Sequence, residues 1–213
     1  MSLSRRITLA LPYIATAMTC TSCSYMGGDL LAVSQVAKNL WNGPQAVTLE
    51  QVSAIPYATI GVKIGNSNQV ILILATDTNQ QRLWTSGNRI SVVTNADGRI
   101  IRTAGLGQDL SSYVVANNTS AQSFQWQADF KDLGLYGVTG ACEIRPAKSE
   151  EITLLGKPFH TLRVEERCES KQLHWRYENI FWRDPGDGFV WRSRQRIHPK
   201  MSPIETETLR PPA

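Results

Sequence analysis

The strongest constraint on the fold is a series of short segments rich in β-branched residues, each bounded by glycine, asparagine or aspartate. In the first half of the chain these segments are 57–65, 69–76, 89–95 and 99–105. The turn sequence Asn95–Gly98 (NADG) separates two of them, and such a turn between apolar segments is typical of a β-hairpin. This pattern predicts antiparallel strands joined by tight turns.

The second half of the chain continues the same pattern. Further strands are predicted at 123–130, 151–156, 159–169, 172–184, 188–197 and 204–211, with hairpin turns at 156–158 and 184–188. The total is about ten closely spaced strands, with no internal repeat or linker between them. We therefore predict a mainly β fold, an antiparallel meander that forms a barrel-like or sandwich domain.

One segment before the strands follows a different period. Residues 29–43 place apolar side chains at helical spacing, with Asp29 as a candidate N-cap and Gly43 as a stop signal. We expect one N-terminal helix there, covering one end of the sheet.

The first eighteen residues have the features of an export signal. Arg5 and Arg6 precede an uncharged apolar stretch from Ile7 to Met18. A basic start followed by a short apolar region is typical of a secretory signal peptide. The apolar stretch is too short to span a membrane, which takes about 20 residues.

Two cysteines follow this stretch and indicate a bacterial lipoprotein, in which the signal is cut just before a cysteine that then carries lipid. Cys23 is the better candidate because the small Ser22 precedes it, and Cys20 is the alternative. A soluble exported protein cut near Ala17 is the other interpretation. We predict a signal peptide at 1–22, a tether at 23–28 and a single β-rich domain at 29–213. Ser24 is not the aspartate that retains lipoproteins in the inner membrane, so an outer-membrane location is expected.

Composition excludes several function classes. The 22 lysines and arginines include Arg5 and Arg6 of the signal, so the remaining chain is nearly balanced against its 18 acidic residues. No basic run is present, which argues against nucleic-acid binding. The three histidines are scattered without metal-ligand spacing, and no motif of a catalytic or phosphate-binding site occurs. We expect no metal and no cofactor apart from the covalent lipid.

The two remaining cysteines, Cys142 and Cys168, are a candidate disulfide. Bacterial lipoproteins face an oxidising compartment, where such a bridge persists. A bridge across 26 positions would stabilise the fold by roughly 3 kcal/mol. Two buried free thiols are the alternative.

Aromatic and basic residues alternate near the C-terminus, within one predicted hairpin. The candidate glycan-binding residues are Trp175, Trp182, Trp191, Arg192, Arg194 and Arg196. The three arginines share a strand face, with Trp191 on the opposite one. Guanidinium groups pair with carboxylates and aromatic rings stack on sugars, so an acidic polysaccharide is a candidate ligand. The alternative interpretation is that the tryptophans are core residues and the arginines a solvated face.

Three stretches together resemble one protein family. They are IPYATIGVKIG (55–65), LWTSGNRISVVTNADGRIIRTAGLGQDL (83–110) and the block from Trp175 to Pro211, which contains NIFW and GFVWRSRQ. Taken in this order, the three stretches resemble the YjbF-type, group 4 capsule lipoprotein family. Residues 111–140 match least, and the residues before Cys23 depart from the family's aliphatic pattern.

The resemblance implies an outer-membrane lipoprotein, lipidated at the position of Cys23, with a β-barrel-like meander and a role in polysaccharide production or export. The family has no established catalytic residues, so none is carried over. We therefore expect a non-enzymatic, periplasm-facing protein that binds exopolysaccharide or an export protein of the same pathway. The alternatives are an envelope scaffold that partners an outer-membrane barrel protein, and a glycan-modifying enzyme.

Overall fold

The computed structural model describes residues 47–78, 80–87, 89–116 and 122–212. The predicted helix at 29–43 and the candidate lipid sites Cys20 and Cys23 lie outside these ranges. The described elements are α2 (Leu49–Ser53), β1 (Thr59–Ile64), β2 (Val70–Asp77), β3 (Gln81–Thr85), β4 (Ser91–Asn95), β5 (Ile100–Ala104), β6 (Ser112–Val115), β7 (Ser123–Phe130), the 3₁₀ turn η1 (Lys131–Leu133), β8 (Leu135–Ile144), β9 (Lys148–Leu154), β10 (Lys157–Ser170), β11 (Trp175–Arg183), β12 (Val190–Gln195) and β13 (Ile204–Arg210).

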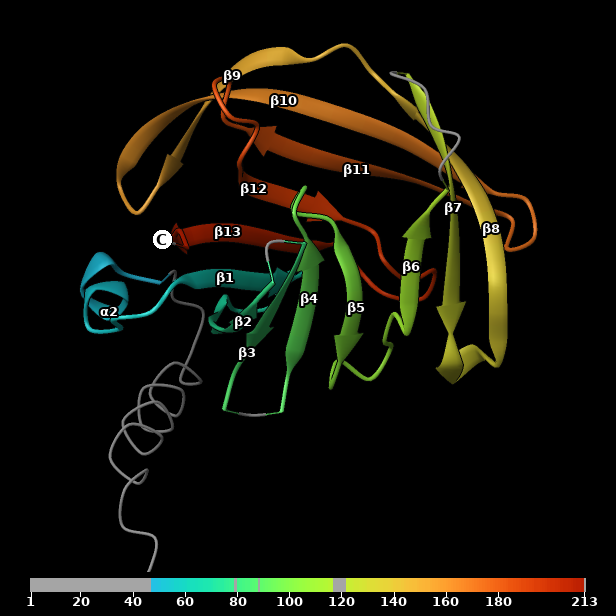
Figure 1. The fold of residues 1–213 in the computed structure, drawn as a ribbon, viewed down its shortest axis with the longest axis horizontal. Coiled ribbons are helices and arrows are strands. Elements are labelled where there is room, and N and C mark those ends of the chain that lie inside the picture. Colours follow the sequence, from blue (N-terminus) through green and yellow to red (C-terminus); the bar gives the residue numbers. More distant parts are fainter. Residues whose placement is uncertain (1–46, 79, 88, 117–121, 213) are drawn as a thin grey trace, which may run out of the picture.

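The strands form one antiparallel sheet in the order β5-β4-β3-β2-β1-β13-β12-β11-β10-β8-β7-β6, and β9 pairs with β10 off this path. Pairing of β1 with β13 joins the two ends of the meander. The sheet curls until β5 and β6 approach each other (Figure 1), and near that junction the Thr103 N–H donates to the Leu110 carbonyl at 2.9 Å. The predicted antiparallel, barrel-like meander is confirmed, as a nearly closed barrel.

Three of the described strands were missed by the sequence prediction. β3 follows the turn at Thr78 so closely that it was read as part of the connection, and β6 has only four residues. β8 is interrupted by Gly137, whose φ of 65° accompanies an irregularity in the β7–β8 pairing. Short or interrupted strands carry too few alternating positions for a period of two to be recognised.

The inside of the barrel is filled by alternating side chains. In β7, for example, Phe124, Trp126, Ala128 and Phe130 are buried, whereas Gln125 and Gln127 point outward and are exposed. The main apolar cluster draws on strands from both halves of the sheet, from Ile60 in β1 to Ile204 in β13. The core is therefore the barrel interior.

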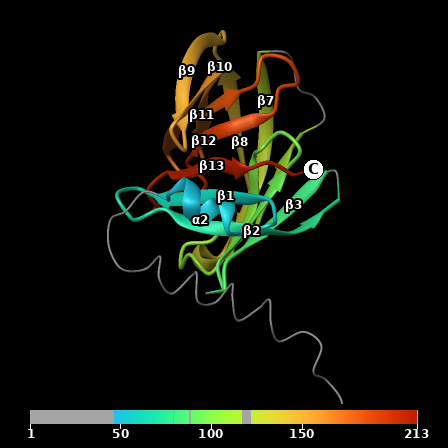
Figure 2. The same ribbon diagram turned by 90° about the vertical axis from the view of Figure 1, so that its left-hand side faces the viewer.

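A second, smaller apolar cluster lies where α2 packs against β2 and β13, on the side of the barrel that faces the viewer in Figure 2. Thr48 caps α2 by accepting from the Gln51 N–H, while the Gln51 side chain accepts from the Thr48 N–H. Val52 of α2 then contacts the cluster around Ile71. The sequence analysis predicted no helix between residue 43 and the first strand, so this helical turn was missed.

Candidate functional site

The centre of the barrel holds a buried ion pair between two distant parts of the chain. Arg99 follows the β4–β5 turn, and Glu166 lies in β10. The Arg99 Nη1 and Nη2 atoms donate to the two Glu166 carboxylate oxygens at 2.9 Å and 2.5 Å. Glu166 also accepts from the Asn179 side chain at 3.4 Å. This forked geometry satisfies the carboxylate from several sides, as a buried charge requires.

Aromatic rings surround the guanidinium of Arg99. The ring centroids of Phe124, Phe181 and Tyr113 lie 4.9, 5.1 and 5.7 Å from its central carbon. Burial by itself lowers the pKa of Arg99, but the surrounding groups, first among them the Glu166 carboxylate, together outweigh burial, and the pKa is raised overall. Burial raises the pKa of Tyr113 as well. Arg99 therefore stays charged, and Tyr113 stays neutral, at any physiological pH.

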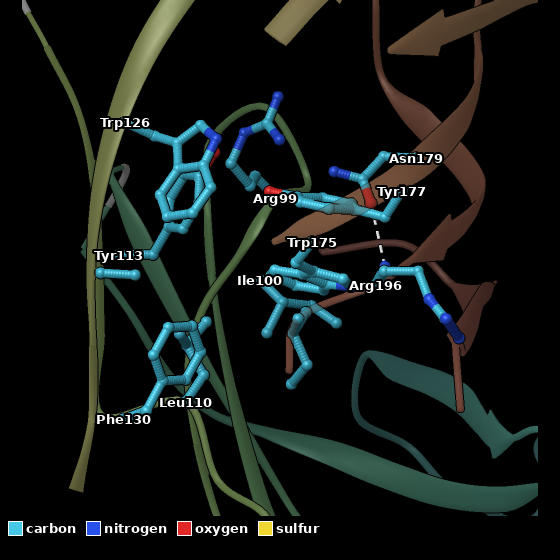
Figure 3. Close-up of a pocket in the computed structure, with 12 residues that line it drawn as sticks. Arg99, Ile100, Leu110, Tyr113, Trp126, Phe130, Trp175, Tyr177, Asn179 and Arg196 are labelled. Atoms are coloured by element: carbon cyan, nitrogen blue, oxygen red, sulfur yellow. Dashed lines mark hydrogen bonds between the residues drawn. The ribbon is translucent and has the colours of Figure 1, made fainter. Parts of the chain in front are cut away.

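Below this pair, two stacked pairs of rings face each other across the lumen (Figure 3). Trp175 and Tyr177 stack with centroids 3.9 Å apart, and Tyr113 stacks on Trp126 at 5.6 Å. The space left between these walls is only about 10 Å³, which is about the room that one water molecule needs. Within the described part of the chain, this cavity between the rings therefore has no room for a sugar.

Gly140 provides the space for Trp126. A Cβ atom at this position would overlap the indole ring and would stand 2.7 Å from the carbonyl oxygen of Glu169. Only a residue without a side chain lets β8 pass this close to the ring.

Replacing Gly140 with alanine is therefore expected to lower the free energy of unfolding by about 1–3 kcal/mol, the usual cost of overpacking a core. Urea unfolding followed by tryptophan fluorescence measures the change. Gly87→Ala is the matched control, because a Cβ there meets nothing within 4 Å and should change stability by less than about 0.5 kcal/mol. Equal stability of the two variants would show that Trp126 moves aside without cost.

The disulfide candidates lie beside the ion pair. Cys142 in β8 and Cys168 in β10 are directly opposite partners and are both buried. In the structure their sulfur atoms are bonded to each other. With Glu166 they lie close enough for a metal site, but here the two sulfurs are joined and the carboxylate is held by Arg99.

The structure does not bring the six candidate glycan-binding residues onto one surface. Trp175 is inside the lumen, and Arg196 lines the rim of the same small cavity. A register shift between β11 and β12 leaves Trp191 as an extra residue, where it packs on Phe159 at 4.6 Å. A bulge changes which face a residue occupies, so strict alternation does not extend to Trp191, whereas Arg192 and Arg194 keep the shared face predicted for them, with the buried Ser193 between them.

The other three candidates, Trp182, Arg192 and Arg194, lie side by side on the outer face, where neighbouring side chains contact them. Trp182 lies between the guanidinium groups of Arg163 and Arg192, each less than 6 Å from its ring. Arg192 also pairs with Glu207 at 2.7 Å and donates to the Thr153 carbonyl. Arg194 is half exposed and lies 3.7 Å from Glu205. Most of this charge is thus neutralised by partners on β13.

A different part of the outer surface contains two hollows. Two adjoining hollows of about 510 and 440 Å³ lie on the outer face of β6, β7, β8, β10 and β11. They share Ala141 and Glu169, and we call the two together the outer groove. No sequence motif marks this groove, because its residues come from five strands. The only signal is a small residue, Ala141, at an outward position among long polar ones.

Among the described residues, no helix has the length and apolar character needed to cross a membrane.

Comparisons with known proteins agree with this architecture. Lipoprotein GfcB of Escherichia coli K12 is 22% identical over 172 residues, which cover 76% of this chain and 80% of GfcB. The crystal structure of lipoprotein YmcC from Escherichia coli K12 has a TM-score of 0.64 and 20% identity, and it matches 85% of this chain and 96% of YmcC.

The family described as group 4 capsule polysaccharide lipoprotein GfcB, YjbF matches residues 30–209. Its lipoprotein members indicate an association with the cell envelope, and its name is consistent with a capsule-related role. The resemblance stated from the three sequence stretches is confirmed over most of the chain, and this protein belongs to the YjbF family of group 4 capsule polysaccharide lipoproteins.

Proposed function

We propose that this protein is a periplasm-facing outer-membrane lipoprotein that assists the production or export of a capsule or exopolysaccharide by binding, without catalysis. The family supports the link to capsule polysaccharide. The basic and apolar N-terminus followed by Cys23, with Cys20 as the alternative, supports lipid anchoring. More than one acyl chain on the cysteine makes such anchoring stable.

The observation that carries the binding role is the packed interior. The lumen leaves about 10 Å³, and the carboxylate at its centre is held by Arg99 and Asn179. Among the described residues, this cavity has no room for a polymer, which favours binding on the outer surface. This favours a role in which the barrel is a rigid platform rather than a reaction chamber.

The second candidate function is an envelope scaffold that joins an outer-membrane barrel protein. It is favoured by the position of β9, which among the described residues pairs with β10 alone. An exposed strand edge is able to accept a strand from another protein. However, β9 carries Lys148, Glu150 and Glu151 on exposed positions, and charges of this kind discourage edge-to-edge pairing.

The proposed function is tested by deleting the gene in the native host and measuring polymer outside and inside the cell. Lower release with retained polymer is the expected result, and the wild-type gene should restore release. Unchanged amount and location of the polymer would overturn the polysaccharide role. Co-purification with a membrane barrel protein in that case would support the scaffold instead.

A further inference from the structure

We propose that the outer groove binds an uncharged, hydroxyl-rich segment of a polysaccharide. This inference rests on the proposed function and adds to it the place and the chemical class of the ligand. The two hollows of the outer groove have volumes of about 510 and 440 Å³, which fall in the range of small-molecule binding sites. Both hollows open onto the barrel surface, where a long polymer can reach them.

The shape of the groove follows from the register of the strands. Ala141 of β8 lies directly between Gln125 of β7 and Glu169 of β10. Glu169 in turn faces Arg176 of β11. A short side chain flanked by longer ones in registered positions produces a depression that crosses the strands, and Ala141 is its floor.

The wall formed by β7 has unused hydrogen-bonding capacity. Gln125 and Gln127 are exposed, and their amide groups make no hydrogen bond with any residue in the described part of the chain. Each amide offers an acceptor oxygen and two donor hydrogens. A sugar hydroxyl likewise both donates and accepts, so neighbouring hydroxyls on a sugar ring match this wall.

The charges around the groove cancel. Its lining holds three acidic residues and three basic ones: Glu143, Glu169, Glu178, Arg167, Lys171 and Arg176. Four of them form cross-strand pairs, Arg167 with Glu178 and Arg176 with Glu169, each at 3.0 Å. A balanced surface gives no net attraction for an acidic polymer, and the carboxylates oppose it at close range. The complementary ligand is an uncharged segment.

The test uses the whole lipidated protein in nonionic detergent and affinity electrophoresis in gels that contain dextran, galactomannan, xyloglucan or alginate. At least one neutral polymer should retard the wild type. Ala141→Trp fills the floor and should abolish the retardation, whereas Ala104→Trp, at another exposed strand position, should keep it. Gln125→Ala/Gln127→Ala should weaken binding about tenfold, since two hydrogen bonds are removed, and Gln81→Ala should not.

Three results would overturn the groove as the site: no retardation by any neutral polymer, retardation by alginate alone, or equal retardation of Ala141→Trp and the wild type. Loss of binding in Arg192→Gln/Arg194→Gln/Arg196→Gln, with Ala141→Trp unaffected, would assign the ligand to the arginine row. The deletion strain separates this failure from that of the proposed function. If deletion blocks polymer release and Ala141→Trp restores it fully, the groove is wrong and the role in export stands.

Discussion

Replacing Glu166 with glutamine is expected to lower the free energy of unfolding by about 3–5 kcal/mol, the range observed when one partner of a buried ion pair is removed. The Arg99 guanidinium is surrounded by the rings of Tyr113, Phe124 and Phe181, and the nearby Arg183 is itself a cation that interacts with both Arg99 and Glu166. A guanidinium is so basic that it keeps its proton inside a protein, so without Glu166 the Arg99 side chain would be a buried cation without its counter-charge. In thermal unfolding this corresponds to a fall in Tm of about 10 °C.

The matched control is the neighbouring glutamate. Glu165 points to the opposite side of β10, is partly exposed and contacts Arg163. Glu165→Gln should therefore lower the free energy of unfolding by less than about 1 kcal/mol. The double variant Arg99→Met/Glu166→Met replaces both charges by apolar groups and should recover most of the lost stability. A Glu166→Gln protein that unfolds at the same urea concentration as Glu165→Gln would contradict this account.

Removal of the Cys142–Cys168 bridge is the second large effect that we expect. The bridge closes a loop between cysteines that are 26 positions apart. The entropy of loop closure then predicts that Cys142→Ala/Cys168→Ala lowers the free energy of unfolding by roughly 3 kcal/mol. Urea unfolding with and without the reductant TCEP measures this. Reduction should bring the wild type close to the stability of the double variant, and it should leave that variant unchanged.

The disulfide lies close to the buried ion pair, so the effects of the two changes should depend on each other. Cys168 is two positions from Glu166 on the same face of β10, and both lie against the lumen. We therefore expect Glu166→Gln and the cysteine double variant to be non-additive when combined, as residues in contact are. A wild type whose unfolding does not respond to TCEP would show that the bridge does not stabilise the fold in solution.

Most of the fold was predictable because its signals are local. The turns at Asn95–Gly98 and Asp184–Gly188 each lie within a few residues of the strands that they join, and the structure has hairpins at both. The alternation in 123–130 was equally clear, since every second residue is buried. The strands that were missed, β3, β6 and β8, are short or contain a glycine irregularity, so the periodic signal was weak.

The candidate site was less predictable, because side chains that meet in a barrel come from different strands. An aromatic- and arginine-rich hairpin at 175–196 suggested one binding surface, but the curl of the sheet divided it between the lumen and the outer face. A bulge then altered the face of Trp191. Neither the curl nor the bulge has a signal in the composition of that segment.

The sequence by itself determined the antiparallel hairpins and the family, and the export signal at the N-terminus stays a prediction from the sequence. These depend on residues within a few positions of one another, or on stretches that can be compared directly. Only the tertiary structure decided that Arg99 meets Glu166 from 67 positions away, and that Ala141 becomes the floor of a groove between β7 and β10. The physical reason is that register and closure of a sheet are set by all its strands together, so the neighbours of a side chain across the barrel are fixed only once β1 has paired with β13.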